Sequence, residues 1–127
     1  MIAMRVLLVD DERELVATLA ERLSLRGIQA DWAISGEEAL TLAEDTIYDV
    51  AVLDVKIPRM SGLELKKKLK ARSPNMKFIF VTGHGSEDDF RIGSAEAGEK
   101  YYLAKPVNIE ALINTMNEVL KTNEGKA

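Results

Sequence analysis

The chain has 127 residues, 46% of them hydrophobic and 30% charged, and a formal net charge of −4. This length and composition suit one globular domain with a buried core and exclude a disordered chain. The mild acidity argues against nucleic acid as the main partner, and the absence of cysteine excludes disulfides, thiolate catalysis and thiolate metal sites. No apolar run approaches the ~18 residues that a membrane span needs.

Apolar runs and amphipathic stretches alternate from the start of the chain. Residues 6–9 form a short apolar run that ends at two acids, which predicts a strand. The next stretch predicts a helix that ends at Gly27, with an apolar face formed by Leu15, Val16, Leu19 and Leu23. Residues 28–32 alternate between apolar and polar, as in a half-exposed strand at the edge of a sheet.

The middle of the chain carries the clearest buried strand. Ser35 and Glu38 match a capping box that opens a helix through Ala43. The run Tyr48-Asp49-Val50-Ala51-Val52-Leu53-Asp54 follows. Its unbroken apolar core is typical of a parallel strand covered on both faces, and it ends on the single carboxylate of Asp54.

The remaining elements continue the alternation. A lysine-rich helix is predicted over 63–72, a buried strand over 78–81, a helix over 86–98 and a short strand over 101–103. The last helix follows Asn108 as its cap and carries an apolar stripe over 109–120. Residues 122–127 are expected to fray as a short polar tail.

Five β-then-α units predict an α/β fold, a doubly wound parallel sheet with helices on both faces. The interpretation is one domain over residues 1–121, without linker or repeat. In such a sheet, the carboxyl ends of the strands meet at one edge, where ligands bind. The residues that follow four of the strands are Asp10 and Asp11, Asp54, Thr82 and Lys105.

This set of side chains has a definite chemistry. Clustered carboxylates repel one another unless a hard cation neutralises them, and oxygen-only ligands suit Mg²⁺ or Mn²⁺. A carboxylate is also a competent nucleophile that can form an aspartyl phosphate. The metal, an ammonium and a hydroxyl would then stabilise the developing charge.

Four motifs together resemble a known family, the receiver domains of two-component response regulators. They are Leu8-Val9-Asp10-Asp11-Glu12, Asp54 with Pro58-x-Met60-Ser61-Gly62, Val81-Thr82-Gly83-His84, and Tyr102-Leu103-Ala104-Lys105-Pro106. The resemblance covers essentially the whole chain, in the order and spacing of the family. It implies a single-domain, chemotaxis-regulator-like receiver: a flavodoxin-like fold with five strands in the order 2-1-3-4-5 and five helices.

The resemblance also implies roles for these residues. Asp54 would accept the phosphoryl group from a histidine kinase or phosphotransfer protein. Mg²⁺ would bind to Asp11, Asp54 and the backbone carbonyl of Lys56, with Asp10 acting through coordinated water. Lys105 would pair with the phosphoryl group, Thr82 would donate its hydroxyl to it, and Gly83 would leave the approach to Asp54 open. Pro106 stands where the family often has a cis bond.

A switch and an output surface are implied as well. Tyr102 matches the switch aromatic that turns inward when Thr82 moves, and the output would pass through the fourth helix, fifth strand and fifth helix, where a phosphorylation-dependent homodimer could form. The alternative is that Tyr102 is an ordinary strand aromatic. Glu99 and Tyr101 depart from the small and acidic residues usual near there, which leaves the partner of this face open.

Two further positions invite a hypothesis about rates. Lys56 and His84 lie two residues beyond Asp54 and Thr82, where their side chains would flank the phosphoryl group and influence access of water to it. The lysines over 66–70 could instead suggest a nucleic-acid patch. The favoured interpretation is the solvated face of a helix whose Leu65 and Leu69 face the core.

The leading hypothesis is therefore a cytoplasmic phosphoacceptor module, without enzymatic output, that uses Mg²⁺ and signals to a separate protein. One alternative is a receiver cut from a longer regulator such as a transcription factor. Another is a Mg²⁺-dependent aspartyl-phosphate phosphatase, although Lys56 stands where those enzymes carry a second acid. A flavodoxin-like nucleotide binder lacks support, because no glycine-rich loop follows the first strand.

Overall fold

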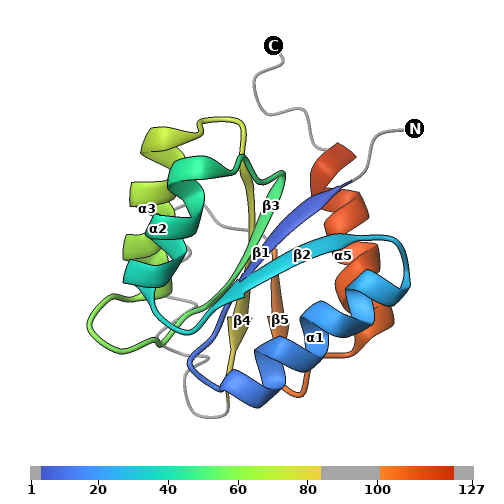
Figure 1. The fold of residues 1–127 in the computed structure, drawn as a ribbon. Coiled ribbons are helices and arrows are strands. Elements are labelled where there is room, and N and C mark those ends of the chain that lie inside the picture. Colours follow the sequence, from blue (N-terminus) through green and yellow to red (C-terminus); the bar gives the residue numbers. More distant parts are fainter. Residues whose placement is uncertain (1–3, 84–100, 122–127) are drawn as a thin grey trace.

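The computed structural model describes residues 4–83 and 101–121, which form a parallel sheet between two layers of helices (Figure 1). The strands are β1 Arg5–Val9, β2 Gln29–Ala33, β3 Val50–Asp54, β4 Lys77–Thr82 and β5 Tyr102–Ala104. The helices are α1 Arg13–Leu25, α2 Gly36–Asp45, α3 Gly62–Arg72 and α5 Ile109–Lys121. The expected helix over 86–98 and the tail 122–127 lie outside the described residues.

The sheet has the order β2-β1-β3-β4-β5 with every pair parallel, which confirms the predicted fold class and strand order. The hydrogen-bond register pairs Val9 with Leu53 and Asp54 with Val81. Strands β1, β3 and β4 therefore end at nearly the same level, and the residues that follow them meet at one edge.

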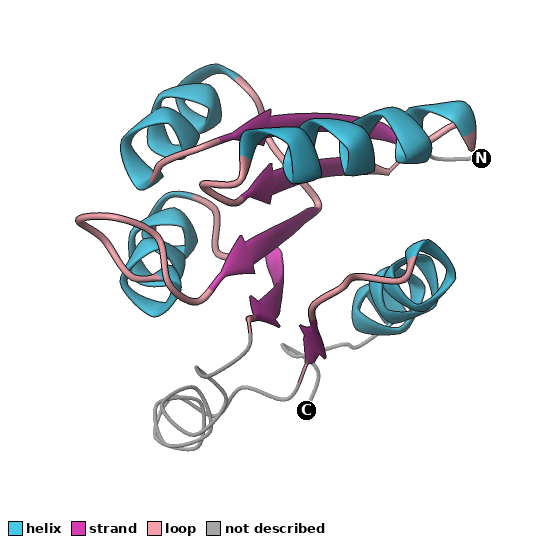
Figure 2. Ribbon diagram, turned by 90° about the horizontal axis from the view of Figure 1, so that it is seen from below, coloured by secondary structure: helices cyan, strands magenta, loops and turns pink. Residues whose placement is uncertain are grey.

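Successive residues of the central strands enter two separate cores, one on each face of the sheet. Leu7, Ala51, Leu53 and Phe80 pack under α2 and α3, whereas Val6, Leu8, Val50 and Val52 pack under α1 and α5. Figure 2 shows from below the helices that lie on the two faces of the sheet. This burial on both faces explains why β3 reads as a continuous apolar run rather than an alternating one.

The helix boundaries follow local capping chemistry. Ser35 Oγ accepts from the backbone N–H of Glu38 at 3.1 Å, so the predicted cap at Ser35 forms. The returning bond differs from a strict capping box, because Glu38 Oε1 accepts from the N–H of Ile34 at 2.9 Å rather than from that of Ser35. Asn108 caps α5 as predicted, because its Oδ1 accepts from the N–H of Ala111. Gly27 ends α1 with a φ of 81°, a conformation that costs glycine little.

The lysine-rich helix α3 has the orientation that the sequence favoured. Leu65 and Leu69 are fully buried beneath it, while Lys67, Lys68 and Lys70 are exposed. The predicted start at residue 63 is one residue too late, because α3 begins at Gly62. Ser61 caps it by accepting from the N–H of Glu64 at 3.1 Å. In the part of the chain that the structure describes, no helix is long and apolar enough to cross a bilayer.

Candidate functional site

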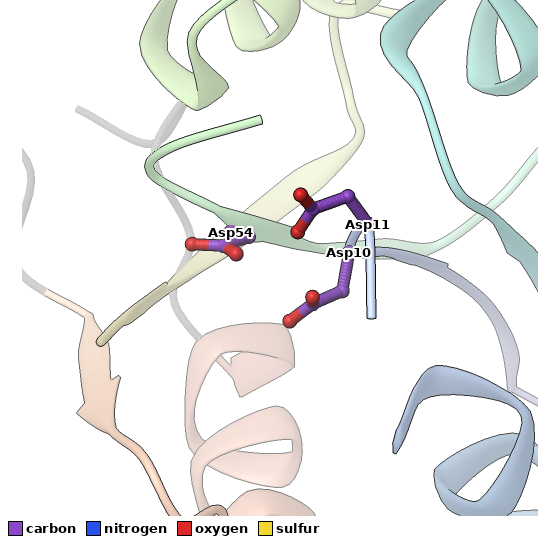
Figure 3. Close-up of side chains that lie close together, drawn as sticks. All are labelled: Asp10, Asp11 and Asp54. Atoms are coloured by element: carbon purple, nitrogen blue, oxygen red, sulfur yellow. The ribbon is translucent and has the colours of Figure 1, made fainter. Parts of the chain in front are cut away.

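The ends of β1 and β3 bring three acids together. Asp10 and Asp11 directly follow β1, and Asp54 is the last residue of β3. One ligand oxygen from each of the three lies within 4.8 Å of the others. Figure 3 shows the three carboxylates gathered at this edge. The predicted convergence of these acids is therefore observed.

Two of these acids are buried and held by the backbone. Asp10 and Asp54 are each 6% exposed, whereas Asp11 is exposed to solvent. Asp10 Oδ1 accepts from the N–H of Glu12 at 2.9 Å, and Asp54 Oδ1 accepts from the N–H of Lys56 at 3.2 Å. One oxygen of each buried carboxylate is thus fixed, and the other is left for the site.

Lys105 supplies a positive charge to that remaining pair of oxygens. Its Nζ lies 2.9 Å from Asp10 Oδ2 and 3.2 Å from Asp54 Oδ2. The residue directly follows β5, and its own N–H donates to the carbonyl of Thr82 at 2.9 Å, which ties it to the end of β4. The bond from Lys105 to Pro106 is cis.

The electrostatics of the site favour the binding of a cation. Burial raises the pKa of Asp54, with a further contribution from the charge of Asp10, and Lys105 only partly opposes this. For Lys105, burial disfavours the ammonium, but the hydrogen bond to Asp10 and the charges of Asp54 and Asp10 outweigh it, so its pKa is raised.

Lys105 therefore remains a cation at every relevant pH, yet it is outnumbered. Lys105 contacts Glu12 as well, and Asp11 lies close to Asp10 and Asp54. The site therefore holds four carboxylates and one ammonium, a formal excess of three negative charges. Oxygen donors without sulfur or nitrogen are the set that Mg²⁺ prefers, so these residues fit that ion.

Thr82 contributes a buried hydroxyl to the site. It is the last residue of β4 and is 1% exposed, and its Oγ1 has no hydrogen-bond partner among the described residues. Buried hydroxyls are nearly always paired, so this one is a candidate donor to a group that binds at the site.

The structure says less about the roles of the other residues predicted for the site. Among the described residues, a Cβ on Gly83 would meet Lys105 Cδ alone, at 3.9 Å, and the role of Gly83 in the approach to Asp54 stays a prediction. Tyr102 is 50% exposed on the edge strand β5. The side chain of Lys56 is exposed, and its carbonyl as a metal ligand also stays a prediction. His84 lies outside the described residues.

Two residues beside the site have contacts that sequence reasoning missed. Glu12 Oε1 lies 3.2 Å from Lys105 Nζ, although the two residues are 93 positions apart. Gly62 packs against the main chain of Asp54, where a Cβ would overlap the carbonyl oxygen. Both residues belong to the quoted motifs, but only the fold shows what they touch.

Comparison with known proteins agrees with this geometry. The family model of the response regulator receiver domain matches residues 6–117. The chain belongs to the response regulator receiver domain family. This assignment confirms the resemblance that the four motifs indicated, and it places the acidic edge in a family of phosphoacceptor domains that work with histidine kinases and are typically not enzymes.

Two curated relatives are longer than this chain. It is 38% identical over 117 residues to the transcriptional regulatory protein CpxR of Escherichia coli, covering 92% of this chain and 49% of that protein. It is 34% identical to the response regulator MprA of Mycobacterium sp. strain KMS, covering 92% and 50%. The chain thus spans about half the length of these curated relatives.

Solved receiver domains match along almost their whole length. A CheY-like receiver domain protein from Methanospirillum hungatei has a TM-score of 0.83 at 33% identity, covering 94% of both chains. A receiver domain from Clostridium thermocellum has a TM-score of 0.82 at 30% identity, covering 92% of this receiver and 94% of that one.

Proposed function

We propose that this receiver domain takes a phosphoryl group onto Asp54 from the phosphohistidine of a sensor kinase or phosphotransfer protein. The observation that carries the proposal is the setting of Asp54. Its carboxylate is buried at the sheet edge, lies 3.2 Å from Lys105 Nζ and shares the site with two further acids. A structural aspartate needs none of these neighbours.

The chemical step is a transfer between two nucleophiles. A carboxylate oxygen of Asp54 attacks phosphorus, and a new O–P bond forms while the N–P bond of phosphohistidine breaks. The bonding electron pair returns to the imidazole nitrogen, which takes a proton from solvent. Negative charge on the transferring oxygens is stabilised by the Lys105 ammonium, which the surrounding carboxylates keep protonated.

Mg²⁺ is the cofactor that the acids suit. Asp11, Asp54 and the carbonyl of Lys56 would hold it, with Asp10 acting through a bound water. When bound, the ion would neutralise charge on the carboxylates and on the phosphoryl oxygens. The three negative charges in excess of Lys105 support this assignment, because they would otherwise repel an anionic phosphodonor.

The change on Asp54 would be sensed by Thr82 and Tyr102. The buried Oγ1 of Thr82 is unpaired within the described residues and can donate to a phosphoryl oxygen. Movement of Thr82 would vacate space near β5, and Tyr102, which is half exposed in the described state, would turn inward. A downstream protein would then recognise the altered surface of β5 and α5, together with the expected helix over 86–98.

A second candidate is a receiver that acts within a longer transcriptional regulator. The observation in its favour is that the chain covers only half of relatives such as CpxR, whose name makes it a transcriptional regulatory protein. Measuring the mass of the native protein by immunoblot would separate the two candidates. A product twice this length supports the second, and one of this length supports a separate downstream partner.

Phosphotransfer tests the proposed function directly. Acetyl phosphate with Mg²⁺ should add one phosphoryl group to the native protein, and borohydride reduction followed by peptide mass spectrometry should locate it at Asp54. Asp54→Asn should abolish the labelling, while Asp45→Asn, an exposed acid on α2, should not. Labelling that persists in Asp54→Asn would contradict the proposal.

A further inference from the structure

The ammonium of Lys105 has one more carboxylate partner than the proposed chemistry uses. Its Nζ lies 2.9 Å from Asp10, 3.2 Å from Asp54 and 3.2 Å from Glu12. A lysine ammonium has three N–H donors, and three carboxylates already compete for them. A newly arriving anion must therefore displace or share one of these contacts.

The three partners differ greatly in how much water they meet. The side chains of Asp10 and Asp54 are 9% and 7% exposed, whereas that of Glu12 is 61% exposed. Removing Lys105 from a buried carboxylate leaves an uncompensated charge in a poorly solvated place. Removing it from Glu12 costs little, because water and salt already solvate that carboxylate.

We propose that Glu12 is the exchangeable partner of Lys105. It is a positioning residue that holds the ammonium over the acids before phosphorylation and gives up its donor to the oxygens of the phosphoryl group afterwards. The inference rests on the proposed function of Asp54 as phosphoacceptor. It assigns to this chain a competition between a protein carboxylate and the phosphoryl group for one lysine.

Competition of this kind has a predictable direction. With Glu12 present, the incoming phosphoryl group must replace the contact between Lys105 and Glu12. The net stabilisation from its attraction to Lys105 is therefore smaller. Removing the charge of Glu12 should free that donor and speed phosphorylation by acetyl phosphate. The size should be that of an exposed ion pair, about twofold to fivefold.

The first experiment measures the contact itself, without any phosphodonor. In protein labelled with ¹⁵N-lysine, the ammonium protons of Lys105 should exchange with water faster in Glu12→Gln than in the native protein. Glu12→Asp, which keeps the charge but shortens the reach, should also exchange faster. Glu14→Gln, an exposed acid two residues along that removes the same charge, should leave the exchange unchanged.

The second experiment measures the competition in the phosphorylation reaction. At saturating Mg²⁺ and equal ionic strength, Glu12→Gln should react with acetyl phosphate about twofold to fivefold faster than Glu14→Gln. Equal rates in these two variants would overturn the inference, as would slower reaction of Glu12→Gln or unchanged exchange of the Lys105 protons in it. Melting curves of all variants, recorded alongside, show that the compared proteins are folded.

The two experiments separate this inference from the proposed function. If native protein takes no phosphoryl group on Asp54, the proposed function fails and this inference fails with it. If Asp54 is labelled but Glu12→Gln matches Glu14→Gln, then Asp54 keeps its role and only the exchange at Lys105 is wrong.

Discussion

Gly62 lies against the main chain of Asp54, with no room for a side chain between them. A Cβ built on Gly62 would overlap the carbonyl oxygen of Asp54 and would lie 3.1 Å from its carbonyl carbon. The N–H of Gly62 also donates to the carbonyl of Val55 at 2.8 Å. The first turn of α3 is therefore fastened directly to the end of β3, beside the carboxylate proposed to react.

Replacing Gly62 by alanine should destabilise the domain and disturb this end of β3. The obstacle is backbone rather than the far end of a flexible side chain, so the free energy of unfolding should fall by about 1–3 kcal/mol, measured by urea denaturation. Gly83→Ala is the matched control, because in the described part of the chain its Cβ would meet Lys105 Cδ at 3.9 Å, an ordinary contact, and no backbone atom. Equal losses of stability in the two variants would contradict the steric explanation.

Mg²⁺ should stabilise the folded domain through the three acids. If the dissociation constant is ~1 mM, then ~10 mM Mg²⁺ should raise the free energy of unfolding by about 1.4 kcal/mol. Thermal melts with and without Mg²⁺ measure this gain. Asp11→Asn should remove most of it, whereas Asp45→Asn should keep it, and a gain that is the same in both variants would point to binding elsewhere.

Asp54→Asn should be more stable than the native domain when Mg²⁺ is absent. The folded-state pKa of Asp54 is raised by burial and by Asp10, so folding favours its protonated form. The stability that protonation contributes is fully present below the unfolded pKa and is lost as pH rises through the folded pKa. The neutral amide avoids that loss, so the variant should have a higher free energy of unfolding than the native domain at pH 7.

The pH dependence of the stability difference between Asp54→Asn and the native domain tests this explanation. Urea denaturation should show the advantage of Asp54→Asn shrinking as the pH falls into the acid range, where the native carboxyl group takes up its proton. An advantage that stays constant over the whole range would show that charge is not its cause.

Tyr48→Phe should destabilise the domain by about 1 kcal/mol near neutral pH, through loss of a hydrogen bond. Tyr48 is 2% exposed, and its hydroxyl donates to Asp31 Oδ2 at 2.6 Å. Burial, followed by the hydrogen bond to Asp31, raises the pKa of Tyr48 to about 12. The neutral Tyr48 hydroxyl therefore stabilises the fold fully below its unfolded pKa of ~10, and this stabilisation is lost as the pH rises toward 12.

Urea denaturation at several alkaline pH values measures this effect. The native protein should lose stability faster than Tyr48→Phe between about pH 10 and 12, so the difference between them should shrink. Parallel curves over that window would show that the folded environment of Tyr48 does not favour its neutral form.

Features that depend on residues close together in the sequence could be predicted without the fold. The cap at Ser35, the cap at Asn108 and the apolar run into Asp54 each depend on residues a few positions apart. Strand β5 was set one residue early, at 101–103 rather than Tyr102–Ala104. Three residues with little alternation give no internal marker of where such a strand begins.

Contacts between distant segments could not be read in this way. The convergence of Asp10, Asp54 and Lys105 followed from topology, because the edge of a parallel sheet collects strand ends. The third contact of Lys105, with Glu12, depends on the reach of two long side chains, which no spacing rule supplies. The close approach of Gly62 to Asp54 likewise depends on how the loop after β3 returns, and in that loop Arg59 adopts a φ of 69°.

The register of the sheet also determines where the chain can accept inserted or deleted residues. Val9 pairs with Leu53, and each strand alternates its side chains between two cores, so the facing of Asp10 and Asp54 depends on how many residues precede them in β1 and β3. One residue inserted or deleted within β3 would turn Asp54 to the opposite face, and the β3 side chains between the change and Asp54 would enter the wrong core. Insertions and deletions within β1 and β3 should therefore be rejected.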